Sequence, residues 1–342
     1  MLTSCAAGSE KPVAFFSADH SAIQYTGRID FKNPQSPRFW QPGVNINTVF
    51  VGGTCSVIIK DEFIGGVVHN YIEVIVDGKE KRLRLQSATD TIEVASGLSA
   101  GNHTLIICKN TEANIGYIEF AGILCDSLIA PNPKPQRKIE FIGNSITSGT
   151  GSDQSAIPCG KGRWEDQHNA WLSYGAIAAR ALNAQYHLSS VSGIGLMHSC
   201  CGMTITMPEV FDKVHMNQNA IPWNFNNYQP DVITVCLGQN DGIQDSVVFT
   251  GKYLAFLRQL RKYYPAATIV CLNSPMADDR LSGVLKAYLS AIVNTIQKED
   301  PKVDKFFFSR RYYHGCDTHP NLEEHKEMAG ELTTFLKTKM KW

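Results

Sequence analysis

Residues 137–151 read RKIEFIGNSITSGTG, an apolar run that ends at a glycine and is followed by small polar residues. The run at 138–142 predicts a buried β-strand. Gly143 permits a sharp turn after that strand, and Ser145 stands where a helix begins. This arrangement would place the Ser145 hydroxyl at the edge of a pocket. Taken alone, it is equally typical of an ordinary serine at a helix N-terminus.

Downstream of this stretch, segments typical of strands alternate with segments typical of helices. We expect strands at 138–142, 185–191, 231–237, 267–272 and 305–309, and helices at 167–183, 247–264, 281–299 and 321–339. The segment 231–237 has no polar alternation, which is typical of a strand buried on both faces. The alternation predicts a three-layer α/β/α domain over residues 138–342, with a five-stranded parallel sheet. In such sheets, reactive groups lie at the carboxyl ends of the strands.

Upstream, residues 1–129 have a different pattern. Short runs rich in β-branched and aromatic residues are separated by turn residues, and several of them alternate apolar with polar side chains. This pattern predicts an all-β domain, a β-sandwich of the jelly-roll type. Three prolines between 131 and 135 predict a stiff, extended linker, which we place at residues 130–137.

The overall composition excludes some classes of function. The 342 residues include 32 Lys and Arg and 32 Asp and Glu, so the formal net charge is zero. A nucleic-acid partner is not expected, because binding to phosphates needs a basic surface. No apolar run has the length needed to span a bilayer, so no transmembrane segment is expected. A neutral glycan fits this charge balance better.

The residues Leu2-Thr3-Ser4-Cys5 have the form of a lipobox, although the apolar stretch of a leader does not precede them. One interpretation is an exported lipoprotein, periplasmic or on the cell surface, that is anchored by lipid at Cys5 after its leader has been removed. The alternative is a chance match of four residues.

The chain has ten cysteines, several of them within strand-like apolar runs, where free thiols behave as small apolar side chains. Cys200 and Cys201, together with Cys159, could form a disulfide in an oxidising compartment, but the sequence leaves the pairing open. Histidines stand near Cys200 and Cys316, but neither His–Cys pair is matched by a second pair of metal-ligand residues elsewhere in the sequence. No metal site is therefore expected.

Three more short segments follow predicted strands. They are SGIG at 192–195, LGQND at 237–241 and GCDTHPN at 315–321. Glycine lets the backbone approach a substrate oxygen, and an asparagine amide can donate to a developing oxyanion. Serine is a poor nucleophile until a base such as histidine removes its proton. Each segment could also be a plain turn or a helix cap, but their order along the chain favours a single site.

This ordered set resembles the SGNH (GDSL-like) hydrolases, and within them the two-domain acetylxylan esterases of carbohydrate esterase family 2. The matching segments lie at 139–151, 171–184, 192–196, 237–241 and 317–321, with 38–54 and 70–78 similar to that family's N-terminal jelly roll. The resemblance implies that Ser145 is the nucleophile and that His319 is the general base. It implies an oxyanion hole made by the N–H groups of Ser145 and Gly193 and by the Asn240 side chain.

Within the same resemblance, Asp317 is the expected orienting acid, although some members of the family orient the histidine with a backbone carbonyl. Thr318 stands where members often carry tryptophan, so Trp164 or Trp223 could supply the stacking face for a sugar, unless they are core residues.

The implied function is a serine esterase that removes acetyl groups from xylan, glucomannan or a related hemicellulose, without a cofactor. Three alternatives remain: an esterase acting on another small acyl ester or a bacterial glycan, a non-catalytic carbohydrate-binding surface protein, and a lipid-anchored structural protein of the cell surface. The last is motivated only by residues 2–5.

Overall fold

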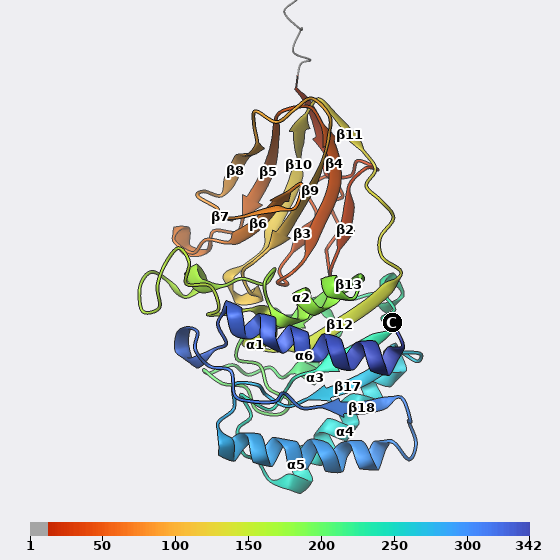
Figure 1. Ribbon diagram of the computed structural model, residues 1–342. Coiled ribbons are helices and arrows are strands. Elements are labelled where there is room, and N and C mark those ends of the chain that lie inside the picture. Colours follow the sequence, from red (N-terminus) through yellow and green to blue (C-terminus); the bar gives the residue numbers. More distant parts are fainter. Residues whose placement is uncertain (1–12) are drawn as a thin grey trace, which may run out of the picture.

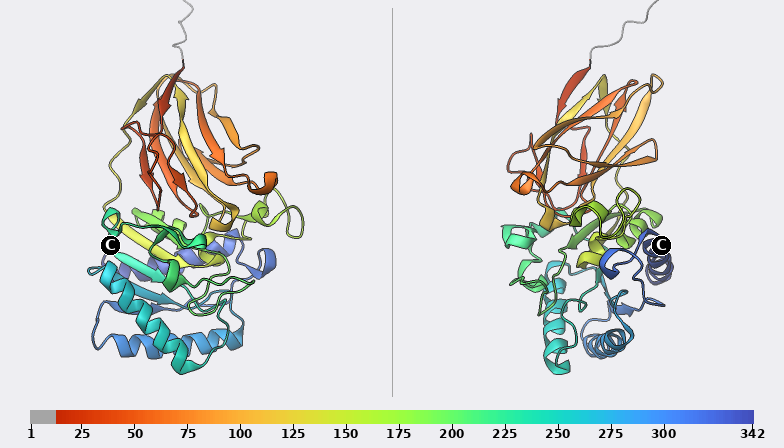
Figure 2. Two further views of the ribbon diagram at one scale, coloured as in Figure 1. Left: turned by 180° about the vertical axis from the view of Figure 1, so that it is seen from behind. Right: turned by 90° about the vertical axis from the view of Figure 1, so that its left-hand side faces the viewer.

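The structure is a computed structural model in which residues 13–342 are described. An all-β part is stacked on an α/β part (Figure 1). Figure 2 shows from behind and from the side that the first part rests on the second. Residues 130–136 carry no helix or strand and connect the two parts. The predicted architecture is confirmed, and we propose that this segment is the linker between domains at 1–129 and 138–342.

The N-terminal part is a sandwich of two antiparallel sheets. One sheet holds β1 (Ala14–Ser17), β3 (Arg38–Phe39), β5 (Cys55–Asp61), β8 (Thr89–Ala95) and β10 (Ile118–Cys125). The other holds β2 (Gln24–Thr26), β4 (Asn45–Val51), β6 (Tyr71–Val76), β7 (Lys79–Arg84), β9 (Asn102–Lys109) and β11 (Ser127–Ile129). Alternate residues of β5 are buried, as a strand with one face against the core requires.

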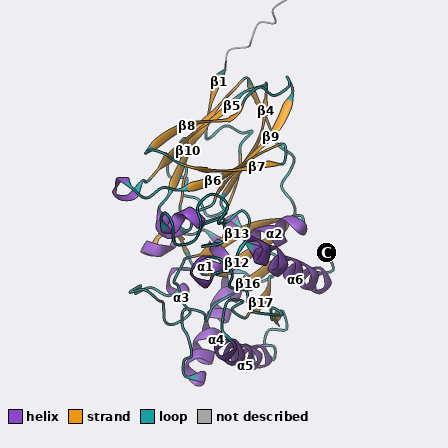
Figure 3. Cartoon of the chain, turned by 60° about the vertical axis from the view of Figure 1, so that its left-hand side comes forward, coloured by secondary structure: helices purple, strands orange, loops and turns teal. Residues whose placement is uncertain are grey.

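The C-terminal part is built on a five-stranded parallel sheet in the order β13-β12-β16-β17-β18. These strands are β12 (Arg137–Gly143), β13 (Ala184–Ser190), β16 (Val232–Val235), β17 (Thr268–Leu272) and β18 (Val303–Phe306). The helices are α1 (Ser145–Ser148), α2 (Tyr174–Ala181), α3 (Met207–Val210), α4 (Ser246–Tyr263), α5 (Asp279–Ile296) and α6 (Leu322–Met340). A small hairpin, β14 (Lys213–His215) and β15 (Ala220–Pro222), lies outside the sheet. Figure 3 shows the helices concentrated in this part of the chain.

Both faces of the parallel sheet are covered. On β16, Ile233 and Val235 pack into a core with residues of α4 and α5, whereas Val232 packs into a second core with residues of α2 and α6. The side chains of a strand point alternately to its two faces, so a strand between two helical layers must be apolar throughout. This is why the segment around 231–237 shows no polar alternation.

The helix expected at 167–183 is shorter than predicted, because α2 begins at Tyr174. The backbone of the preceding residues binds the N-terminal part instead of forming helical hydrogen bonds. The N–H of Ala170 donates to the carbonyl of Asn110 over 3.1 Å, and the N–H of Trp171 donates to the Asn110 side chain over 3.0 Å. The last strand, expected at 305–309, spans Val303–Phe306.

Polar contacts join the two parts. The Arg28 side chain is 1% exposed and forms an ion pair of 2.7 Å with Glu140 of β12. Arg28 also donates to the carbonyl of Lys213 over 2.9 Å, and the Tyr71 hydroxyl donates to Asp166 over 2.6 Å. A buried arginine with several acceptors fixes a single geometry, because each lost partner would leave a buried charge unpaired.

Within residues 13–342, no helix is both long enough and apolar enough to cross a membrane. The lipobox-like residues at 2–5 lie outside the described part of the chain.

Candidate active site

Ser145 is the first residue of α1, and only Asn144 separates it from the carboxyl end of β12. The Asn144 side chain caps this helix by accepting from the N–H of Ile146 over 3.2 Å. At Gly143, an added Cβ would collide with the side chain of Thr147, so only glycine lets the helix begin this close to the strand. Ser145 is 7% exposed and lines a pocket, as the sequence predicted for its hydroxyl.

His319 lies between a short 3-10 turn, η6 (Cys316–Thr318), and the N-terminus of α6. Its Nε2 atom is 2.8 Å from Ser145 Oγ, so the structure brings together the predicted nucleophile and base. Burial lowers the pKa of His319 below the ordinary value of 6.5, although the Cys316 carbonyl and the charge of Asp317 act in the opposite direction. The neutral imidazole is the form that can take a proton from the serine.

The group that orients His319 is a main-chain carbonyl. The Nδ1 atom lies 3.1 Å from the carbonyl oxygen of Cys316. Asp317 is exposed and has a left-handed backbone with φ of 49°, and the backbone of Thr318 is also left-handed, with φ of 60°. This turn presents the preceding carbonyl to the imidazole and leaves the Asp317 carboxylate in solvent. Of the two orienting groups that the sequence left open, we therefore propose the Cys316 carbonyl rather than the Asp317 carboxylate.

A disulfide between Cys159 and Cys316 ties the histidine turn to the loop that follows α1. The N–H of Cys316 donates to the carbonyl of Gly151 over 2.8 Å, and the N–H of Gly315 donates to the carbonyl of His319 over 2.6 Å. The sequence left the partner of Cys159 open. Cys316 stands 157 residues away, and no local pattern connects the two.

Gly193 and Asn240 reach the same pocket from the ends of β13 and β16. Gly193 has φ of 84°, a conformation that favours glycine. The Asn240 amide donates to the carbonyl of Ile194 over 2.8 Å, which holds this side chain beside the Gly193 loop. Among the described residues, the N–H groups of Ser145 and Gly193 donate to no protein acceptor. They remain available to a substrate oxygen, as an oxyanion hole requires.

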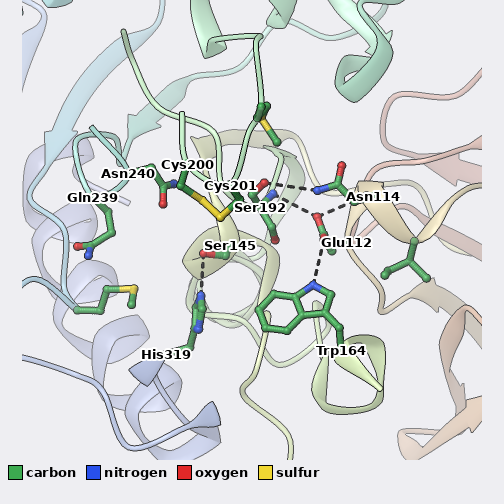
Figure 4. Close-up of a pocket in the computed structure, with 14 residues that line it drawn as sticks. Glu112, Asn114, Ser145, Trp164, Ser192, Cys200, Cys201, Gln239, Asn240 and His319 are labelled. Atoms are coloured by element: carbon green, nitrogen blue, oxygen red, sulfur yellow. Dashed lines mark hydrogen bonds between the residues drawn. A yellow bond between two sulfur atoms is a disulfide. The ribbon is translucent and has the colours of Figure 1, made fainter. Parts of the chain in front are cut away.

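The pocket has a volume of about 610 Å³, and Figure 4 shows the side chains around it. The N-terminal part contributes Glu112, with Asn114 and Ile115 of the 3-10 turn η2 (Ala113–Ile115). The buried Glu112 carboxylate accepts from the indole N–H of Trp164 over 3.3 Å and from the N–H of Ser192 over 3.2 Å. Sequence reasoning missed Glu112, because its partners come from the other part of the chain.

The two tryptophans considered as a stacking face for a sugar lie in different environments. Trp164, in the 3-10 turn η3 (Trp164–Gln167), is 39% exposed, lines the pocket and has its ring 5.9 Å from the His319 ring. Trp223 is buried in the core, where the Arg28 guanidinium lies over its ring. Trp164 is therefore the tryptophan that can face a substrate. The remaining 3-10 turns, η1 (Ile64–Gly66), η4 (Met216–Gln218) and η5 (Phe225–Asn227), are outside the pocket.

Comparison with protein families matches both parts of the chain. Residues 25–135 match the family described as "Carbohydrate esterase 2 N-terminal", and residues 141–326 match the "GDSL-like Lipase/Acylhydrolase family". The chain belongs to carbohydrate esterase family 2. Its relatives include the cellulase/esterase CelE of Acetivibrio thermocellus, which is 34% identical over 95% of this chain. The chain spans only 40% of the length of CelE.

A second relative of this family 2 chain is the acetylxylan esterase/glucomannan deacetylase of Cellvibrio japonicus. It is 30% identical, over 95% of this chain and 91% of the relative. A family two carbohydrate esterase from Clostridium thermocellum in complex with cellohexaose has a TM-score of 0.85 and 31% identity, over 94% of this chain and 99% of that one. A family two esterase from Cellvibrio japonicus has a TM-score of 0.88 and 27% identity, over 96% and 98%.

Proposed function

We propose that this chain is a serine esterase that removes O-acetyl groups from an acetylated polysaccharide such as xylan or glucomannan. The observation that carries the proposal is the hydrogen bond of 2.8 Å between Ser145 Oγ and His319 Nε2. This pair lies in the same pocket as Gly193 and Asn240. Nucleophile, base and oxyanion donors are the set that acyl transfer requires.

The reaction proceeds in two acyl-transfer steps. Ser145 Oγ attacks the carbonyl carbon of the ester while His319 Nε2 takes its proton. The N–H groups of Ser145 and Gly193 and the Asn240 amide donate to the negative oxygen of the tetrahedral intermediate, and removing one such donor costs about 3–4 kcal/mol. His319 then gives its proton to the leaving sugar oxygen, and an acetyl-serine remains. Water attacks this ester with His319 again as base, and acetate leaves.

Two features support a glycan as the alcohol part of the ester. Trp164 offers a half-exposed aromatic face beside His319, where the leaving alcohol must receive its proton. A relative at 31% identity is a family two esterase in complex with cellohexaose, and another relative carries the name acetylxylan esterase/glucomannan deacetylase.

We also propose that the protein works outside the cytoplasm, in the periplasm or at the cell surface. The disulfides Cys159–Cys316 and Cys200–Cys201 support this, because disulfides persist in oxidising compartments. Lipid attachment at Cys5 is part of the same proposal. The intact mass of the native exported protein, compared with that of a Cys5→Ala variant, tests it.

The experiment that tests the esterase function is acetate release from p-nitrophenyl acetate, acetylated xylan and acetylated glucomannan. We expect Ser145→Ala to lower kcat by about 10⁴-fold or more. Ser96→Ala, which changes an exposed serine of the sandwich, should retain full activity. Equal background rates for the wild-type protein and Ser145→Ala would refute the esterase function. Retention of the glycan without turnover would then favour a carbohydrate-binding protein.

A further inference from the structure

The pocket contains a disulfide between two adjacent residues, Cys200 and Cys201. Cys201 is exposed and Cys200 is half-buried. A disulfide between neighbours closes a small ring with the intervening peptide, so its sulfur atoms form a stiff and largely apolar surface. Figure 4 shows this ring and His319 on opposite sides of Ser145.

Hydrogen bonds and close packing hold the ring against the Gly193 loop. The N–H of Cys200 donates to the carbonyl of Gly193 over 2.9 Å, and the N–H of Met203 donates to the carbonyl of Cys200 over 3.0 Å. A Cβ added at Gly193 would lie 3.1 Å from Cys200 Sγ. The Cys200 sulfur therefore already fills the space beside Gly193. The ring cannot shift toward Gly193 to enlarge the pocket for a substrate.

The geometry of the tetrahedral intermediate assigns a direction to each part of the substrate. The reacting carbon bonds to Ser145 Oγ, to the negative oxygen, to the leaving oxygen and to the acyl carbon. The leaving oxygen must lie at His319, which protonates it, and the sugar beyond it lies on the Trp164 side of the pocket. The negative oxygen points to its donors. The acyl carbon is left with the direction away from His319, where the disulfide stands.

We propose that the Cys200–Cys201 disulfide is the wall that limits acyl length, so that the site accepts an acetyl group and excludes longer acyl chains. This inference rests on the proposed esterase function and adds to it a determinant of the acyl group. A methyl group fits against the sulfur atoms, whereas each further methylene must displace a ring that is bonded to the Gly193 loop. One methylene in a rigid apolar pocket changes kcat/KM by about 10–200-fold.

The test compares kcat/KM for p-nitrophenyl acetate, butyrate and hexanoate between the wild-type enzyme and Cys200→Ala/Cys201→Ala. The butyrate-to-acetate ratio should rise at least about tenfold in the variant, because the wall is removed. Met276→Ala is the matched control. Met276 lines the same pocket but does not belong to the segment 193–203, which holds Gly193 and the disulfide. This control should change the ratio by less than about threefold, well below the discrimination of one methylene.

An unchanged ratio in the double variant, or an equal change in Met276→Ala, overturns the proposal. If the double variant is inactive on every ester, Cys201→Ala keeps the Cys200 sulfur beside Gly193 and should give a smaller increase in the ratio. No increase in this single variant also overturns it. Peptide mass mapping should find Cys200 joined to Cys201 in the wild-type enzyme, and two free thiols would contradict the proposal. Failure of the esterase function itself is seen separately, as equal acetate hydrolysis by the wild-type protein and Ser145→Ala.

Discussion

His319 Nδ1 is hydrogen bonded to the carbonyl oxygen of Cys316 over 3.1 Å, at the place where a Ser-His-Asp triad has a carboxylate. The carbonyl accepts a hydrogen bond from the Nδ1–H group and so fixes the tautomer whose unprotonated Nε2 faces Ser145. It carries no full negative charge, and it therefore stabilises the imidazolium less than a buried carboxylate would. In the proposed mechanism, the site is thus a Ser145–His319 pair supported by a main-chain carbonyl.

Asp317→Asn tests this division of roles. Where a buried carboxylate orients the histidine, its replacement by an amide lowers kcat by about 10⁴-fold. Here the Asp317 side chain is exposed, so kcat for p-nitrophenyl acetate at pH 8 should fall by less than about tenfold. His319→Ala should lose about 10⁴-fold or more. A loss in Asp317→Asn as large as in His319→Ala would show that the carboxylate reaches the imidazole during the reaction.

The pH dependence of kcat/KM should reflect the buried position of His319. Burial lowers its pKa below 6.5, and only the neutral imidazole can act as base. Activity should therefore rise with pH through a midpoint below 6.5 and remain high above it. The charge of Asp317 raises this pKa, so Asp317→Asn should move the midpoint to still lower pH. A midpoint above 7 in the wild-type profile would contradict the burial argument.

Asn240→Ala should lower kcat on p-nitrophenyl acetate by about 10²–10³-fold, with a much smaller change in KM. The reason is that the amide donates to charge that develops only in the transition state. Asn226→Ala, at an exposed position outside the pocket, is the control and should behave as the wild-type enzyme. A rise in KM with unchanged kcat would instead assign Asn240 to ground-state binding.

Cys159→Ser/Cys316→Ser removes the link between the histidine turn and the loop after α1. The free energy of unfolding should fall by about 2–4 kcal/mol, measured with denaturant. Because the disulfide no longer fixes the turn that presents the Cys316 carbonyl to His319, kcat should fall in the same variant. A dithiol should lower the stability of the wild-type enzyme more than that of the double variant, which keeps only the Cys200–Cys201 disulfide. Unchanged stability in the double variant would show that the link does not constrain the fold.

Arg28→Met should destabilise the protein by about 3–5 kcal/mol, because it leaves the buried Glu140 without its ion-pair partner. Arg28→Met/Glu140→Leu removes both charges and should recover much of this loss. Denaturant unfolding of both variants measures the difference. If the double variant is no more stable than the single one, the unpaired charge is not the cause of the loss.

The sequence predicted the parts of the fold and of the site that depend on local pattern. The apolar run before Gly143 and the helix start at Ser145 are neighbours in the chain, so their geometry follows from adjacent residues. The predicted start of α2 was wrong, because the N–H groups of Ala170 and Trp171 donate to the distant Asn110 and helical hydrogen bonding begins only after them. Asp317 stands at a suitable spacing, but a left-handed turn decides which group faces the imidazole. Glu112 reaches the pocket from the N-terminal part, where it caps η2, and no spacing in the chain reveals such a contact.

The position of Glu112 also limits how this chain can be recombined. Its carboxylate comes from the sandwich, yet it holds Trp164 and the N–H of Ser192 in the hydrolase part. A gene fusion that joined residues 138–342 to a foreign binding module would keep Ser145 and His319 but lose one side of the pocket. The sandwich thus forms part of the pocket itself, and residues 138–342 alone would not carry a complete site.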